Sequence, residues 1–181
     1  MATATTALWI AEAQMMKETE TIIQQEMDFF PLKSYTNIVE GNALRIDWND
    51  VVPASELNYI MGNPPFVGHQ LRTDSQVKDM DVVFDGFGNY GKLDYVCCWY
   101  KMAADYMRDT QIKTALVSTN SIVQGESVST LWRPLFEYYP FEITFAHRTF
   151  IWDSEAHIKA HVHCVIIGFS LYKLSTITFL N

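Results

Sequence analysis

The chain has 181 residues, of which 49% are hydrophobic, so it holds enough apolar material to bury the core of one domain. Its formal net charge of −8 argues against a protein that grips nucleic acid mainly by neutralising phosphates. The apolar stretches are too short to span a membrane, no secretory signal is visible and the three cysteines form no disulfide framework, so we expect a protein of the reducing cytoplasm with no membrane partner.

The N-terminal part predicts a helix followed by two strands. Residues 7–27 combine strong helix formers with spaced apolar positions, which predicts one helix or two helices broken near Thr19 to Thr21. A short strand is expected at Asn37–Val39, followed by a Gly-containing strand exit. The next strand is expected at Tyr59–Met61, within an apolar run.

A long loop separates this strand from the clearest helix. Residues 67–91 are rich in Asp and Gly and predict a loop with a short helix, and a loop of this length beside a site is often a lid. The Gly-rich stretch at 86–91 follows no strand, so we interpret it as part of that loop and not as a phosphate site. Leu93–Arg108 carries aromatic and apolar residues at spacings of three and four, which predicts a helix packed against a sheet.

The C-terminal half predicts a sheet with one more helix. Residues 111–119 predict a strand, and Ser127 can cap a helix that runs to about Tyr138. Two closing strands, Glu142–Ala146 and Val162–Leu171, are typical of an antiparallel hairpin. Strands that alternate with helices indicate the α/β class.

The segment Asn63-Pro64-Pro65-Phe66 stands at the exit of the strand expected at 59–61. The Asn63 amide oxygen and the Pro64 carbonyl can both accept hydrogen bonds from one NH2 group, because the prolines fix φ and lack donor N–H groups. Phe66 can stack on the ring that carries this amine. An adenine flipped out of a duplex presents both an N6 amine and a π face. The competing interpretation is a plain turn, since Asn and Pro often end strands.

The order of these segments resembles the catalytic domain of DNA adenine-N6 methyltransferases, in particular those fused to restriction endonucleases in single-chain type II restriction-modification systems. The resemblance extends over most of the chain and implies a Rossmann-like class I methyltransferase sheet with an antiparallel terminal hairpin. It is carried by the helix segment 7–15, the strand exit Val39–Leu44, the motif Gly62–Gly68, the strand and exit Ala115–Gly125, and the closing segments 145–152 and 162–169.

The resemblance implies site-specific methyl transfer from S-adenosylmethionine to the N6 amine of a flipped adenine in double-stranded DNA, in the cytoplasm of a bacterium or archaeon. It makes Asn63, Pro64, Pro65 and Phe66 the catalytic residues, with no metal and no covalent enzyme intermediate. Phe150 or Trp152 would cover the other face or edge of the base, and the choice between them stays open. Asn42, Ala43 and Asn63 would lie near the cofactor.

The family's aromatic and Gly-rich cofactor motif and its first two strands would precede the helix at 7–27, and the sequence does not contain them. We therefore expect residues 1–181 to form a single partial domain, with an N-terminal helix and strand in 1–48 and a catalytic-motif part in 57–171. The absence would leave two sheet edges unpaired. Self-association or a missing N-terminal segment could fill the gap, and whether the chain is active without that motif stays open.

Two other functions remain. A protein-glutamine methyltransferase also has to hold a planar amide NH2, and a non-catalytic remnant or binding subunit would need no cofactor motif. A zinc site at His157, His161, His163 and Cys164 is not expected, because in a strand His161 and His163 lie on one face and Cys164 on the other. A hydrolase triad is not expected either, because the chain has no Gly-x-Ser-x-Gly segment.

Overall fold

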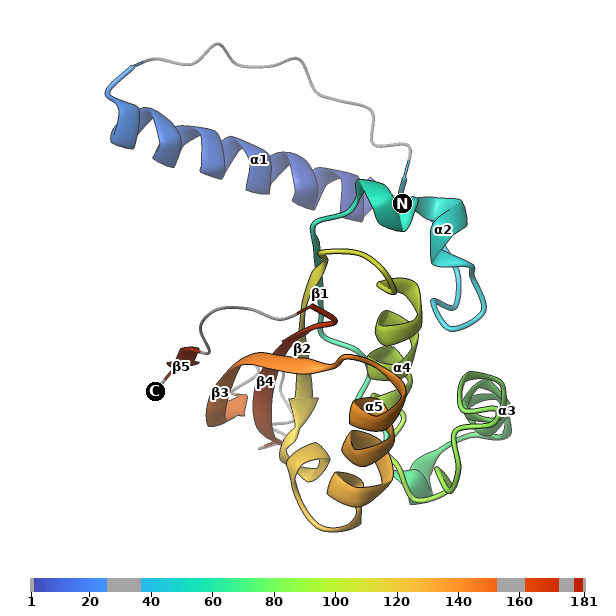
Figure 1. Cartoon of the computed structure of the whole chain (residues 1–181). Helices are drawn as coiled ribbons and strands as arrows, with labels where there is room; N and C mark the ends of the chain where they lie inside the picture. The colour runs from blue at the N-terminus through green and yellow to red at the C-terminus, as the bar shows by residue number, and fades with distance from the viewer. Residues whose placement is uncertain (1, 26–36, 153–161, 173–177, 181) are drawn as a thin grey trace. The chain divides into compact units, whose positions relative to one another are not determined.

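The computed structural model describes residues 2–25, 37–152, 162–172 and 178–180, and the chain divides into two compact units, residues 1–42 and 43–181. The first unit holds one helix, α1 (Ala2–Ile23), drawn in blue in Figure 1. The hydroxyl groups of Thr19 and Thr21 donate hydrogen bonds to the carbonyl groups four residues earlier in the helix. The threonines are thus accommodated within α1, and of the two expectations for this segment the single helix is correct.

The second unit is built on a mixed sheet of five strands in the order β1-β2-β4-β3-β5. The pairs β1–β2 and β3–β5 are parallel, while β4 runs antiparallel to both β2 and β3. This confirms the α/β class and the antiparallel closing pair expected from the sequence. The strands are β1 (Tyr59–Gly62), β2 (Lys113–Thr119), β3 (Glu142–Trp152), β4 (Val162–Ser170) and β5 (Thr178–Leu180).

Four α-helices accompany the described part of this sheet, and α4 and α5 lie beside it in Figure 1. Short 3-10 turns occur at Ala54–Glu56, His69–Leu71 and Asn120–Val123. No described helix is both long enough and apolar enough to cross a bilayer. The helices are α2 (Trp48–Val51), α3 (Asp74–Val83), α4 (Cys97–Tyr106) and α5 (Arg133–Tyr138), the last preceded by a π-helical stretch, Val128–Trp132.

Two sequence predictions about local structure are wrong. Asn37–Val39 is not a strand, since a strand needs a hydrogen-bonded neighbour and no described strand pairs with these residues. Ser127 does not cap a helix, because its backbone is already helical and its side chain makes no capping hydrogen bond. The segment that follows Ser127 instead starts as a π-helix and becomes α-helical one residue before Pro134.

Helix α3 is longer than the short helix expected within residues 67–91. Thr73 caps it with a reciprocal pair of hydrogen bonds, in which the Gln76 side chain accepts from the Thr73 N–H and the Thr73 hydroxyl accepts from the Gln76 N–H. This capping box satisfies two backbone N–H groups that the first turn would otherwise leave unpaired. The pattern Thr-x-x-Gln was the sequence signal for this helix.

The core lies between α4 and the sheet. Tyr100 of α4 is fully buried, and its hydroxyl group pairs with the Ser118 hydroxyl of β2 at 2.7 Å. The Tyr100 ring also stacks on Phe169 of β4, with ring centroids 5.5 Å apart. Burial raises the pKa of the Tyr100 phenol above its ordinary value, so the phenol stays neutral and available as a hydrogen-bond donor. These contacts fix the distance between the helix and the two strands.

At Gly168 an added Cβ atom would collide with a neighbouring side chain. That atom would lie 2.1 Å from the nearest carbon of the Phe145 ring, on the adjacent strand β3. We expect Gly168→Ala to lower the free energy of unfolding by about 1–3 kcal/mol, because the ring must move out of its place. Urea unfolding measures this, with Gly91→Ala as the matched control. At Gly91 the nearest atom would be 3.9 Å away, so a change within about 0.5 kcal/mol is expected there.

The three cysteines are free and buried. Burial raises the pKa of the Cys98 thiol to about 12 and also raises the pKa values of Cys97 and Cys164. Since the thiolate is the reactive form, at pH 8 we expect Cys98 of the folded chain to react with a disulfide reagent about a thousandfold more slowly than a free thiol. In guanidinium chloride, which unfolds the chain, all three thiols should react rapidly. Fast modification without denaturant would contradict the buried placement.

Candidate active site

Strand β1 carries the Asn-Pro-Pro-Phe segment to the carboxyl edge of the sheet. Because β1 is parallel to β2, with Gly62 opposite Leu116, both strands deliver their following loops to the same edge. Asn63 is exposed immediately after β1, and its side-chain amide has no hydrogen-bond partner among the described residues. Pro64 is buried beneath it. The buried proline fixes the backbone while the Asn63 amide stays available to a ligand.

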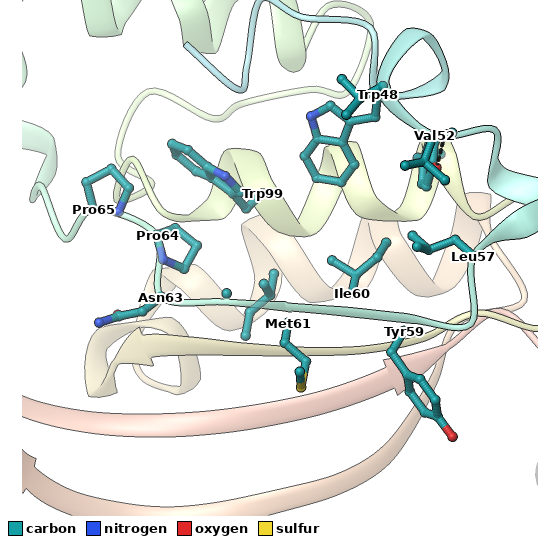
Figure 2. A pocket seen from close by; sticks show the side chains of 14 residues that line it. Trp48, Val52, Leu57, Tyr59, Ile60, Met61, Asn63, Pro64, Pro65 and Trp99 are labelled. Atoms are coloured by element: carbon teal, nitrogen blue, oxygen red, sulfur yellow. Dashed lines mark hydrogen bonds between the residues drawn. The ribbon is translucent and has the colours of Figure 1, made fainter. Parts of the chain in front are cut away.

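A cavity of about 520 Å³ lies along β1 and reaches Asn63. Figure 2 shows Trp48 and Trp99 on the same side of β1 as Ile60, while Tyr59 and Met61 point to the other side. Apolar and aromatic side chains form the walls, and the Asn63 amide is a polar group at one end. The lining residues are Trp48, Val51, Val52, Leu57, Tyr59, Ile60, Met61, Gly62, Asn63, Pro64, Pro65, Trp99, Tyr106 and Leu116.

The aromatic wall of this cavity is held by hydrogen bonds at its polar ends. The Trp48 indole N–H donates to the Ala43 carbonyl at 2.8 Å, and the Tyr106 hydroxyl donates to the Val52 carbonyl. The two rings meet edge to face with centroids 5.5 Å apart. Burial and the nearby Asp47 raise the pKa of Tyr106, which keeps its phenol neutral. The polar atoms are thereby satisfied, and apolar ring surface is left to face a planar ligand.

The structure brings only some of the expected site residues together. Asn63, Pro64 and Pro65 line the cavity, whereas Phe66 is half-buried and packs against the hydrophobic core. Ala43 borders the site through the hydrogen bond from Trp48. Asn42 is the last residue of the other unit, so its place near the cofactor stays a prediction.

The two candidate base-stacking residues belong to β3. Phe150 is half-buried, lies opposite Cys164 of β4 and meets the His147 ring edge to face at 5.5 Å. Trp152 is the last residue of β3, and its side chain lies outside the described part. Their roles therefore remain predictions.

The histidines set aside as a zinc site are only partly described. His157 and His161 lie outside the described residues, while His163 is exposed on β4 and its neighbour Cys164 is buried. The described part of the chain contains no group of three or more His, Cys, Asp or Glu side chains that could hold a metal ion.

The sequence interpretation missed the aromatic wall. The sequence predicts that the aromatic and apolar residues of Leu93–Arg108 pack together against the sheet, but only one face of α4 is fully buried. Trp99 and Tyr106 are half-buried on the face that borders the cavity, and no sequence pattern indicates that Trp48 joins them. The signal was the spacing of seven residues between Trp99 and Tyr106, which sets them on a face separate from Tyr100.

Comparison with known proteins gives consistent matches over nearly the whole chain. Residues 1–180 match the family described as MmeI, DNA-methyltransferase domain. DNA methyltransferase A of Bacillus subtilis (strain 168) is 39% identical over 166 residues, which are 90% of this chain and 19% of that protein. The DNA complex of the Type IIL restriction-modification enzyme MmeI is similar with a TM-score of 0.82 and 44% identity, over 96% of this chain and 23% of that one.

Proposed function

The chain belongs to the MmeI DNA-methyltransferase domain family, and on this premise we propose that it is the catalytic-motif part of a site-specific DNA adenine-N6 methyltransferase in a restriction-modification system. The observation that carries the proposal is the position of Asn63. Its amide is exposed and unpaired among the described residues, beside a buried proline and at one end of an aromatic cavity. The exposed amide can accept a hydrogen bond from an exocyclic amine, and the adjoining cavity can hold a small molecule beside it.

The proposed chemistry needs positioning more than acid-base groups. The Asn63 amide oxygen and the Pro64 carbonyl each accept a hydrogen bond from the adenine N6 amine. These two bonds direct the nitrogen lone pair toward the incoming methyl group. S-adenosylmethionine supplies that methyl group as an electrophile. The bond from N6 to the methyl carbon would form as the sulfur–carbon bond breaks, S-adenosylhomocysteine would leave, and N6 would release one proton to water. Holding the reacting atoms in line supplies most of the rate enhancement.

The cavity fits the cofactor proposed for it. A volume of about 520 Å³ lies within the usual range for small-molecule sites, and aromatic walls suit a planar purine ring. Ala43 would contribute to cofactor binding indirectly. Its carbonyl group accepts the hydrogen bond that holds Trp48 in the wall of the cavity. Asn63 would face both cofactor and base, and Asn42 stays a proposed cofactor-binding residue.

Phe66 and either Phe150 or Trp152 are the residues proposed to cover the flipped base. A base held between two apolar surfaces loses its stacking partners in the duplex but regains comparable contacts in the protein. Phe66 packs against the core in this structure, so its ring has a rigid support. A supported ring holds a base with less loss of side-chain entropy than a free one.

A further segment is proposed to complete the domain. Strand β1 ends the described sheet and pairs only with β2, so its other edge offers free backbone groups. A strand carrying the aromatic and Gly-rich motif, from the same longer polypeptide or from an associated chain, would pair there and close the cofactor site. Such a segment would also contribute contacts to double-stranded DNA. The 181-residue chain has a net charge of −8, so by itself it would bind the phosphate backbone weakly.

The first experiment compares substrates. The chain, alone and supplemented with a segment carrying the Gly-rich motif, is incubated with methyl-labelled S-adenosylmethionine and either mixed-sequence duplex DNA or glutamine-containing peptides. We expect labelled N6-methyladenine in the DNA. Label in the peptides alone would establish the protein-glutamine alternative. No transfer and no binding of S-adenosylmethionine in either preparation would establish the non-catalytic alternative.

A further inference from the structure

The loop that follows β2 is tied by hydrogen bonds to the start of the α4 region. The Asp94 carboxylate accepts a hydrogen bond from the Thr119 hydroxyl at 3.3 Å and another from the Ser121 hydroxyl. The two hydroxyl oxygens lie 2.6 Å apart, so either hydroxyl group can donate to the other in place of its bond to Asp94. Thr119 is the last residue of β2, so Asp94 holds the exit of this strand in place.

The same segment also holds the chain that follows the Asn-Pro-Pro-Phe motif. The N–H of Tyr95 donates to the carbonyl of Val67 at 2.9 Å. Gly68 lies against Asp94, since a Cβ atom on Gly68 would be 3.7 Å from an Asp94 carboxylate oxygen. Asp94 and its neighbour therefore connect the exit of β1 to the exit of β2.

A second link runs from the β2 exit to the strand that carries Phe150. The Asn120 side-chain oxygen accepts a hydrogen bond from the Thr149 hydroxyl at 3.2 Å. From His147 to Phe150 strand β3 advances three residues while its partner β4 advances only two, from Ile166 to Cys164, so β3 has a bulge here. Bulges redirect the side chains around them, and the Thr149 bond fixes this one beside Phe150.

We propose that Asp94 and Asn120 are positioning residues, which together fix the spacing between the segment after Asn63 and Phe150. The proposal deepens the proposed function, because Phe66 lies in the first of these segments and Phe150 is one of the two candidates for the opposite face of the flipped base. Neither residue is assigned a contact with substrate. Their effect follows from geometry, since a displacement of about 1 Å in a reacting group can cost about 100-fold in rate.

Hydrogen exchange read by mass spectrometry tests the linkage in the 181-residue chain. Thr149→Val removes the hydroxyl group and keeps the shape, whereas Thr149→Ser keeps the hydroxyl group. We expect Thr149→Val to speed exchange about fivefold at residues 145–150 and also at residues 66–68, through Asn120, Thr119 and Asp94. Thr149→Ser should restore both. Asn120→Ala and Asp94→Ala should speed the same two segments, with an unchanged urea midpoint.

A matched control separates this linkage from general loosening. Thr110→Val also deletes a threonine hydroxyl group that donates a hydrogen bond, to the Met107 carbonyl at 2.8 Å, but Thr110 lies outside the proposed chain of contacts. It should leave residues 66–68 and 145–150 unchanged. If Thr149→Val speeds exchange at residues 145–150 but not at residues 66–68, the proposal is overturned. The loss of the hydrogen bond would then affect only β3.

Kinetics distinguishes failure of this proposal from failure of the proposed function. In a preparation that methylates DNA, Thr149→Val should lower kcat about tenfold with little change in the KM for S-adenosylmethionine, and Thr149→Ser should restore kcat. An unchanged kcat would refute the positioning role while leaving the function standing. Linked exchange in a chain that never methylates DNA would establish the linkage and overturn the function instead.

Discussion

Replacing Phe169 by alanine is expected to lower the free energy of unfolding by about 3–5 kcal/mol. Phe169 is fully buried in β4, the strand that pairs with both β2 and β3. Its ring stacks between Tyr100 of α4 and Phe141, with centroid distances of 5.5 and 4.5 Å. Truncation removes contacts on both faces and leaves a cavity between Tyr100 and Phe141.

Urea unfolding followed by fluorescence gives this free energy, with Phe136→Ala as the matched control. The same atoms are removed in the control, but Phe136 is 48% exposed and touches Phe141 only edge to face. We expect the control to lose less than about 1.5 kcal/mol, because its ring is already half in water. Equal losses in the two variants would mean that α4 does not depend on Phe169 for its place on the sheet.

Strands β1 and β2 could be predicted from the sequence because each is short and regular. The β2 segment alternates residues of opposite burial, with Thr114, Leu116 and Ser118 inside, so its period of two is visible in the chain. Strand β3 was expected to end at Ala146 but continues to Trp152. Its two irregularities in register, after Ile143 and after His147, interrupt the alternation on which such a prediction depends.

The site was predictable only in its local part. Asn63 and its prolines form a contiguous motif whose chemistry can be read from residue types. The walls of the cavity come from Trp48 and Trp99, far apart in the chain, and only the packing of α2 and α4 beside β1 brings them together. The bond between Ser121 and Asp94 likewise joins residues 27 positions apart. No periodicity within a single segment can reveal such pairs.

Asn63→Ala is expected to lower the rate of methyl transfer by about 100- to 1,000-fold, the range found when one hydrogen-bonding group aimed at a reacting centre is removed. The amide oxygen is the proposed acceptor for the adenine N6 amine. Among the described residues no side chain is hydrogen-bonded to Asn63, so none is positioned to accept from the amine in its place. The rate is measured as labelled N6-methyladenine formed per enzyme, in whichever preparation of the chain transfers methyl groups to DNA.

Two further substitutions at this position separate chemistry from geometry. Asn63→Asp keeps an acceptor oxygen in the same place and should lose only about tenfold, while Asn63→Gln keeps the amide but moves it by one methylene and should lose about 100-fold. All three variants should keep the urea midpoint and the thiol protection of the parent chain, because Asn63 is exposed. If alanine, aspartate and glutamine all leave the rate unchanged, Asn63 is a turn residue and the amine must be held elsewhere.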